Sequence, residues 1–189
     1  MSVAIDWDRP APGEWTTDDL DALPDDGRRH ELIDGVPIVS PSPATGHQRI
    51  AMLLGAALDA LCPPDLAATQ AVDIRLSRRR SLCADVLIVA AEATERNVTH
   101  YLPTEVLLAV EIVSPGSLAM DRVMKPALYT EAGIPYFWRV ETDGGIRVAT
   151  YRLNADTDVY TSTGEFDDVI DVMSPFAISL PIARFSGRR

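Results

Sequence analysis

Two short apolar runs, each interrupted by a single carboxylate, constrain the fold of this chain more than any other feature. Residues 84–89 read Ala-Asp-Val-Leu-Ile-Val, and residues 106–113 read Val-Leu-Leu-Ala-Val-Glu-Ile-Val. Apolar runs of this length, without polar residues in alternation, are typical of strands that are covered on both faces. We therefore expect two buried strands, and the two acids within them, Asp85 and Glu111, need an explanation.

The segments around these runs predict helices and further strands. Asp34-Gly35, between apolar residues on either side, is the strongest hairpin signal in the chain. After His47, apolar residues recur at helical spacing until Pro63-Pro64. Further elements are expected as a short helix from Thr16, strands at 70–76, 135–140, 146–153, 158–162 and 176–180, and a helix at 120–132 that ends before Gly133. This order indicates an α/β fold with a mixed sheet flanked by helices, an N-terminal hairpin and a β-rich C-terminal part.

The size and composition of the chain suit one domain. It has 189 residues, of which 47% are hydrophobic, and we expect an N-terminal tail over residues 1–14 and a single domain over residues 15–185. No apolar run approaches the roughly 18 residues of a membrane span, and the acidic first residues lack the layout of a signal peptide. The expected location is the cytoplasm, where Cys62 and Cys83 would be small, reduced, buried or half-buried residues.

The charge of the chain is strongly acidic but unevenly distributed. The net charge is -11, which argues against a passive nucleic-acid-binding module. Residues 35–140 carry 10 acids and 9 bases, so the excess acid lies in the flanking segments. If Asp85 and Glu111 hold a divalent cation, the rest of that central segment is net positive. The acidic flanks can also mark a partner surface, although a simple soluble face is the favoured interpretation.

Asp85 and Glu111 are the first candidates for chemistry. A buried, unpaired carboxylate costs several kcal/mol, so each must be hydrogen-bonded, paired or metal-bound. If the two strands are neighbours, both side chains can point into one cleft, where hard oxygen ligands suit Mg²⁺ or Mn²⁺. The alternative is that the two carboxylates cap loops or pair with arginines.

Lys125 is the only lysine in the chain, because the other 16 basic residues are arginines. A lysine differs from an arginine in being a compact point charge. Lys125 and Tyr129 lie four residues apart and would share one helix face, although Pro126 disfavours helical geometry at the lysine. Two carboxylates, a metal ion and an ammonium group are the parts needed for metal-assisted phosphodiester hydrolysis.

An ordered set of motifs resembles the Uma-two family of restriction-type endonucleases in the PD-(D/E)XK nuclease superfamily. The motifs are Glu31-Leu-Ile-Asp-Gly35, Ser40-Pro-Ser-Pro43 followed by His47, Ala84-Asp85, Val110-Glu111-Ile-Val-Ser114-Pro115, the spacing of Asp121, Lys125 and Tyr129, and Gly133-Ile-Pro-Tyr-Phe-Trp138. The resemblance covers roughly residues 15–185. It implies a restriction-endonuclease-like core and Mg²⁺-dependent cleavage of DNA.

The resemblance also implies roles for individual residues. Asp85 and Glu111 would hold the metal, with the backbone carbonyl of Ile112 as a further ligand, and Lys125 would be the catalytic lysine. Glu31 would be an accessory acid, and His47 and Tyr129 would lie in the cleft.

This sequence departs from the superfamily pattern at two positions. Ala84 stands where proline is expected before the aspartate, and Val113 stands where lysine is expected two residues after the glutamate. The resemblance places the amine on the following helix instead.

Other candidate residues have ordinary structural explanations beside their functional ones. A run of arginines could contact phosphates or form a solvated turn; it consists of Arg78, Arg79 and Arg80, with Arg75 nearby. His47 could cap a helix, and Glu31 could pair with Arg28 or Arg29. Trp138 and Tyr136 could stack on bases, but they are expected in the core and at an interface.

The sequence thus predicts a dimeric, metal-dependent DNA endonuclease. Alanine at position 85, 111 or 125 should abolish cleavage and leave the fold intact. The alternatives are a catalytically silent nucleic-acid or protein-interaction module with the same fold, and a metal-dependent hydrolase with another substrate.

Overall fold

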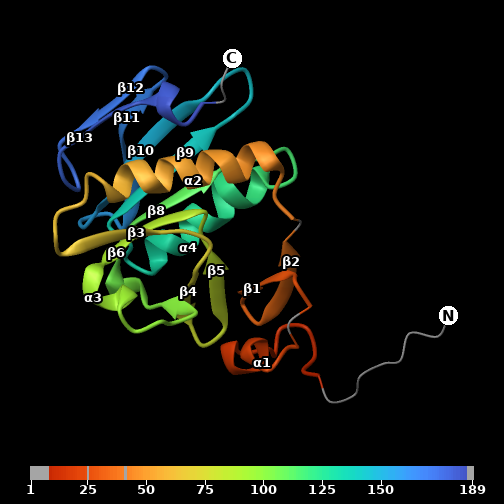
Figure 1. Cartoon of the computed structure of the whole chain (residues 1–189). Coiled ribbons are helices and arrows are strands. Elements are labelled where there is room, and N and C mark those ends of the chain that lie inside the picture. The colour runs from red at the N-terminus through yellow and green to blue at the C-terminus, as the bar shows by residue number, and fades with distance from the viewer. Residues whose placement is uncertain (1–8, 25, 41, 187–189) are drawn as a thin grey trace.

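Figure 1 shows the computed structural model, which describes residues 9–24, 26–40 and 42–186. The helices in these ranges are α1 (Thr17–Asp21), α2 (Thr45–Asp59), α3 (Ala91–Thr94) and α4 (Lys125–Glu131), with 3-10 turns at Pro103–Glu105 and Ile182–Arg184 and a π turn at Met120–Met124. The first strands are β1 (Arg29–Ile33), β2 (Val36–Ser40), β3 (Leu66–Thr69), β4 (Asp73–Ser77), β5 (Arg80–Cys83), β6 (Val86–Ala90) and β7 (His100–Tyr101). The remaining strands are β8 (Val106–Ile112), β9 (Tyr136–Glu141), β10 (Arg147–Asn154), β11 (Val159–Phe166), β12 (Val169–Val172) and β13 (Ile178–Pro181).

The strands form a mixed α/β architecture, as the sequence predicts. A six-stranded sheet has the order β11-β10-β9-β8-β6-β3, a five-stranded sheet has the order β2-β1-β5-β4-β7, and β12 pairs with β13. Strands β8 and β9 run parallel, as do β4 and β7, whereas the other pairs are antiparallel. The two apolar runs become β6 and β8, which are direct neighbours with Val86 opposite Val110.

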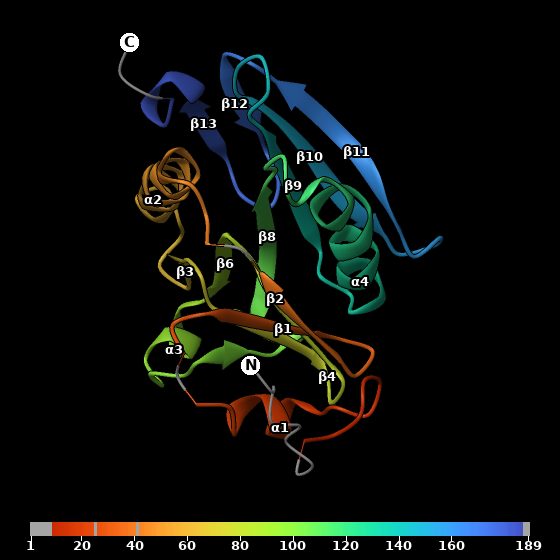
Figure 2. The same cartoon turned by 90° about the vertical axis from the view of Figure 1, so that its right-hand side faces the viewer.

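Both faces of the six-stranded sheet are covered, which explains why β6 and β8 are apolar at nearly every position. Helix α2 lies against one face and α4 against the other (Figure 2). Val86 and Ile88 pack in the core that includes Leu54 of α2, while Leu87 packs in the core that includes Leu128 of α4. Successive strand residues point to opposite faces, so a strand between two cores needs apolar residues at both odd and even positions.

The hairpin predicted at Asp34-Gly35 joins β1 to β2. Asp34 has φ 50° and Gly35 has φ 78°, the pair of positive φ angles that a type I′ turn requires. A Cβ atom at Gly35 would lie 2.6 Å from the carbonyl oxygen of Gly13. The turn therefore also packs against the described part of the expected tail, where the Gly13 N–H donates to the Gly35 carbonyl at 2.8 Å. Residues 1–8 of that tail, and Pro41 of the motif after β2, lie outside the described residues.

Several short elements differ from expectation. The strand expected at 70–76 is β4. Strands β3, β5, β7 and β12 and helix α3 are additional. These elements have two to five residues, too few for a hydrophobic period to register. Strand β5 also begins with Arg80 and Ser81, and the sequence groups this arginine with the preceding ones.

The helix around Lys125 begins differently from the expectation based on Pro126. Lys125 has φ -59° and ψ -46°, which is right-handed helical geometry. The preceding residues form the π turn Met120–Met124, and the Lys125 N–H donates to the Met120 carbonyl. A π turn widens the helix locally, which accommodates a proline that lacks an N–H and would crowd the preceding turn.

Two further expectations concern the cysteines and the membrane. Cys62 is half-buried, Cys83 is buried and both are free, as predicted. No helix in the described ranges is long and apolar enough to cross a membrane.

Candidate active site

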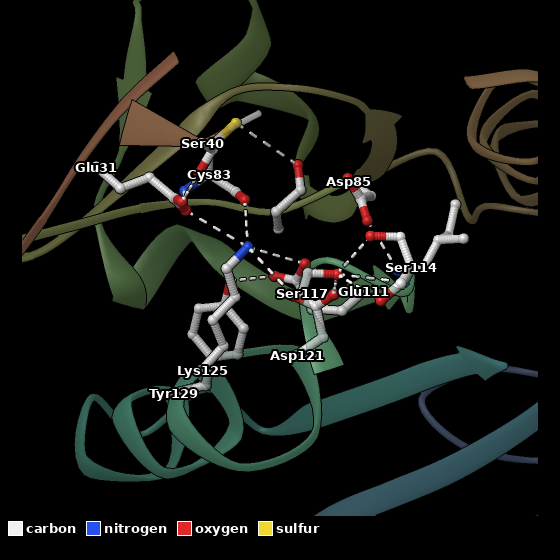
Figure 3. Close-up of polar contacts among 12 residues, drawn as sticks. Glu31, Ser40, Cys83, Asp85, Glu111, Ser114, Ser117, Asp121, Lys125 and Tyr129 are labelled. Carbon is white, nitrogen blue, oxygen red and sulfur yellow. Dashed lines mark hydrogen bonds and ion pairs between the residues drawn. The ribbon is translucent and has the colours of Figure 1, made fainter. Parts of the chain in front are cut away.

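A cavity of about 530 Å³ gathers five of the ten predicted site residues. Its wall is built by β1, β2, the start of α2, the residue before β6, the end of β8, and the loop, π turn and first residue of α4 that follow β8. The charged and imidazole side chains on that wall are Arg29, Glu31, His47, Asp85, Glu111, Asp121 and Lys125. Figure 3 shows Glu31, Glu111 and Asp121 around the ammonium group of Lys125.

The pairing of β6 with β8 brings Asp85 and Glu111 to the same place. Asp85 directly precedes β6, and its N–H donates to the carbonyl of Val110 at 3.2 Å. Val86 is opposite Val110 in this antiparallel pair, so Asp85 is opposite Glu111. Opposed residues of two neighbouring strands point to the same face, and the two carboxylates therefore line one cavity.

Asp85 is held by partners on two sides. Oδ2 accepts a hydrogen bond from the Ile112 N–H at 2.8 Å and lies 3.1 Å from His47 Nε2, while Oδ1 lies 3.9 Å from Arg29 Nη1. Burial pushes the pKa of Asp85 upward, but the hydrogen bond and charge of His47, together with Lys125 and the Ile112 N–H, outweigh it, so the pKa is below its usual value. The Asp85 carboxylate in turn raises the pKa of His47. These groups favour an ionised Asp85.

Glu111 is fully enclosed. Lys125 Nζ donates to Oε2 at 2.9 Å, and the Tyr129 hydroxyl donates to Oε1 at 2.6 Å. Burial raises the pKa of Glu111 well above its ordinary value; Lys125 opposes this rise, whereas Asp85 and Asp121 add to it. Burial and the two neighbouring acids therefore disfavour the ionised form of Glu111, and Lys125 favours it.

Lys125 is the centre of the cluster. Its Nζ donates to the Cys83 carbonyl at 2.9 Å as well as to Glu111, and it lies 3.4 Å from Glu31 and 3.9 Å from Asp121. Burial lowers the pKa of Lys125, but the surrounding carboxylates raise it further, so the net direction is upward and the ammonium stays protonated. The relocated lysine that the sequence predicts on the helix therefore reaches the carboxylates.

Glu31 links the hairpin to the rest of the site. Its Oε1 accepts from the Cys83 N–H at 2.9 Å, and its Oε2 accepts from the Ser40 hydroxyl. Arg28, one of the partners considered for Glu31, lies beside Asp26 instead, at 3.7 Å. Lys125 is the cation next to Glu31.

Other predicted residues have different places. Tyr129 is fully buried and bonds to Glu111, so it contacts a carboxylate of the site and does not line the cavity. The run from Arg78 to Arg80 lies outside the cavity lining: Arg79 donates to the Gly13 and Asp34 carbonyls, and Arg80 pairs with Asp34 and Glu131. These two arginines have structural contacts, in line with the turn interpretation.

The structure adds residues that the sequence analysis did not select. Asp121 lies 3.9 Å from Lys125 and accepts a hydrogen bond from Ser117, and burial raises its pKa. Its position four residues before Lys125 was the available signal. Arg29 stands two residues before Glu31 on the same strand, a spacing that places both on one face.

A larger hollow, of about 920 Å³, lies elsewhere beside the first turn of α2. Its charged residues are Arg49, Arg147, Asp167 and Asp168. None of the predicted site residues lines this hollow. The smaller cavity therefore remains the candidate active site.

The donor set of the cavity fits a metal ion that uses few protein ligands. Within the described ranges, no group of three or more His, Cys, Asp or Glu side chains is arranged to hold a metal ion. Mg²⁺ commonly binds through one or two carboxylates and keeps several waters. The cavity lining has four carboxylates, Glu31, Asp85, Glu111 and Asp121, and two permanent cations, Arg29 and Lys125, and a bound cation would balance part of this excess negative charge.

Tyr129→Phe tests the role of the buried hydroxyl. We expect the free energy of unfolding to fall by about 1–3 kcal/mol, because Oε1 of Glu111 would lose a partner in a buried position. Urea denaturation followed by circular dichroism measures the change. Tyr136→Phe is the matched control, since the Tyr136 ring is only half-buried, and an equal effect of both variants would contradict the role of Tyr129.

Known proteins resemble this chain in sequence and in fold. The family model Uma2, described as "Putative restriction endonuclease", matches residues 17–183. A crystal structure of a "putative nuclease" from Anabaena variabilis superposes with a TM-score of 0.71 over 90% of this chain and 96% of that chain. The two sequences are 20% identical, so this likeness is one of fold. None of the curated proteins matches the chain.

Proposed function

Because the chain belongs to the Uma2 family, we propose that it is a Mg²⁺-dependent endonuclease that hydrolyses phosphodiester bonds of DNA. One observation carries the proposal: the ammonium of Lys125 lies 2.9 Å from Glu111 in a cavity that Asp85 also lines. A strand-end aspartate, a strand glutamate and an amine at one point are the groups that metal-assisted hydrolysis requires. The proposal includes a homodimer acting in the cytoplasm, and the chemistry of the cavity does not depend on either point.

In this proposal Asp85 and Glu111 would hold the cation, with the backbone carbonyl of Ile112 as a further ligand. A bound Mg²⁺ would supply Lewis acidity to the phosphate and a more acidic water. Mn²⁺ could replace it, since both ions accept hard oxygen ligands.

The other groups of the site would stabilise charge on the phosphate or hold the carboxylates and the lysine in position. Lys125, kept protonated by the surrounding acids, would stabilise negative charge that develops on the phosphate. Tyr129 fixes one oxygen of Glu111, and the Ile112 N–H fixes one oxygen of Asp85. Glu31 holds the lysine from the hairpin side, at 3.4 Å.

Mg²⁺-dependent cleavage is the direct test. We expect the purified protein to nick or cut plasmid and linear DNA with Mg²⁺ or Mn²⁺, and to stop when the metal is chelated. Asp85→Asn should reduce the rate at least about a hundred-fold, because it removes one of the two carboxylates proposed to hold the cation. Agarose and denaturing gels measure the products.

The control for this variant is Glu92→Gln, which neutralises an exposed acid outside the cavity and should cleave at the wild-type rate. Full activity of Asp85→Asn, or wild-type cleavage in the presence of chelator, would refute the proposed metal site.

A catalytically silent interaction module with the same fold is the competing function. The observation in its favour is that both oxygens of Glu111 and Oδ2 of Asp85 already accept hydrogen bonds from the protein. Calorimetry with Mn²⁺ separates the two functions: heat of binding that Asp85→Asn removes supports the nuclease, and absence of binding to the wild-type protein supports the module.

A further inference from the structure

Arg29 differs from the other charged groups of the cavity because it is a partly exposed, permanently charged cation. It opens strand β1, and the alternation of strand residues directs Arg29 and Glu31 to the same face. Both line the cavity. The preceding residue, Arg28, lies outside the cavity lining and is near Asp26.

The guanidinium of Arg29 is only loosely engaged. Its closest charged atom is Oδ1 of Asp85, at 3.9 Å from Nη1, which is beyond hydrogen-bond distance. Among the contacts of the described residues, no hydrogen bond of this guanidinium occurs, and 28% of the side chain is exposed. A guanidinium carries five N–H donors, so Arg29 has donors to offer a ligand in the cavity.

Lys125 differs from Arg29 in this respect. Its ammonium already donates to Glu111 and to the Cys83 carbonyl, with Glu31 at 3.4 Å, and its side chain is almost completely buried. An ammonium has three donors. Lys125 can stabilise charge at short range, but it has little capacity to capture an incoming anion.

A phosphate entering this cavity meets four carboxylates, those of Glu31, Asp85, Glu111 and Asp121. Coulomb repulsion from these groups opposes its approach. Arg29 is the partly exposed permanent cation on the lining, and its planar fork matches two oxygens of a phosphate.

We propose that Arg29 is a phosphate-binding residue of this site, which contacts the DNA backbone next to the bond that is cut. This inference rests on the proposed nuclease function and adds a substrate contact to it. The Asp85 contact at 3.9 Å then holds the guanidinium in place until a phosphate provides closer, paired acceptors.

DNA binding by Arg29 variants tests this inference. We would measure the Kd of a fluorescein-labelled DNA duplex by anisotropy over a series of salt concentrations. Ca²⁺ would replace Mg²⁺, and the integrity of the duplex would be checked on a denaturing gel. Arg29→Gln should weaken binding about ten- to hundred-fold. The slope of log affinity against log salt should become shallower by about 0.9, the value for one phosphate contact.

Two further variants separate a phosphate contact from a structural role. Arg29→Lys should keep the wild-type salt slope, because it keeps the charge, and should recover only part of the affinity, because it loses the paired hydrogen bonds. Arg28→Gln is the matched control, since Arg28 is the adjacent arginine and lies outside the lining of this cavity, and the variant should bind like the wild type.

The possible outcomes have different consequences. Wild-type affinity and slope for Arg29→Gln, or equal losses for Arg28→Gln and Arg29→Gln, overturn the role of Arg29. If the wild-type protein still cleaves DNA in that case, the nuclease function stands. If the wild-type protein neither binds nor cleaves DNA, both proposals are overturned.

Discussion

Replacing Lys125 by methionine is expected to lower the free energy of unfolding by about 3–5 kcal/mol and to abolish cleavage. Methionine keeps most of the length of the side chain and removes its charge. Four carboxylates line the cavity around this ammonium, and three of them lie within 3.9 Å of Nζ. Without the ammonium they would repel one another in a buried place, which is why we expect a large loss.

The structure thus changes one expectation from the sequence, that alanine at position 125 leaves the fold intact. Urea denaturation of Lys125→Met and Lys125→Ala measures the loss, and similar values for the two would assign it to charge rather than to packing. Arg96→Ala is the control, because it breaks an exposed ion pair with Glu105 and should cost less than about 1 kcal/mol. Unchanged stability of Lys125→Met would mean that the carboxylates are not ionised together around the lysine.

The centre of the fold was accessible from the sequence because its signals are local. The two apolar runs predicted buried strands, and Asp34-Gly35 predicted the hairpin. The odd carboxylates Asp85 and Glu111 marked the place of the cavity, since a charged group inside an apolar strand has few explanations. The structure confirms that these strands are neighbours.

The rest of the site depends on contacts between distant segments, which no local pattern records. Tyr129 resembled a cleft residue because it shares a helix face with Lys125, but its hydroxyl bonds to Glu111 beneath the cavity. Arg29 was considered only as a partner of Glu31, and its position beside Asp85 requires the packing of β1 near the start of β6. Arg78, Arg79 and Arg80 were considered as phosphate contacts only because three arginines follow one another in the sequence.

The Glu111→Gln variant should lose cleavage while keeping its stability. We expect a rate at least about a hundred-fold below wild type, because the proposed cation loses a carboxylate. Glutamine can preserve the local hydrogen bonds: its carbonyl oxygen can accept from Lys125, and its amide can donate to the hydroxyl oxygen of Tyr129. We expect the free energy of unfolding to stay within about 1 kcal/mol of wild type, or to increase.

The direction in which folding shifts the pKa of Glu111 explains why Glu111→Gln should not lose stability. When folding raises the pKa of a carboxyl group, its ionised form destabilises the folded state at neutral pH. Removing that charge therefore does not lower the free energy of unfolding. Burial raises the pKa of Glu111. Glu141 is the matched control of opposite sign: hydrogen bonding to Arg122 lowers its pKa, so its ionised form stabilises the fold at neutral pH.

We therefore expect Glu141→Gln to lose stability and keep cleavage, and Glu111→Gln to do the reverse. Thermal or urea unfolding and the DNA cleavage assay, applied to both variants, measure the four quantities. If Glu111→Gln is destabilised as strongly as Lys125→Met, then Glu111 serves mainly as the structural partner of the lysine, and its loss of activity would not identify a metal ligand. If Glu111→Gln cleaves DNA at the wild-type rate, the carboxylate is not needed for the chemistry, and the proposed metal site is wrong. Only an inactive and stable variant assigns the buried carboxylate to catalysis, because a group retained at a cost to the fold must be retained for another reason.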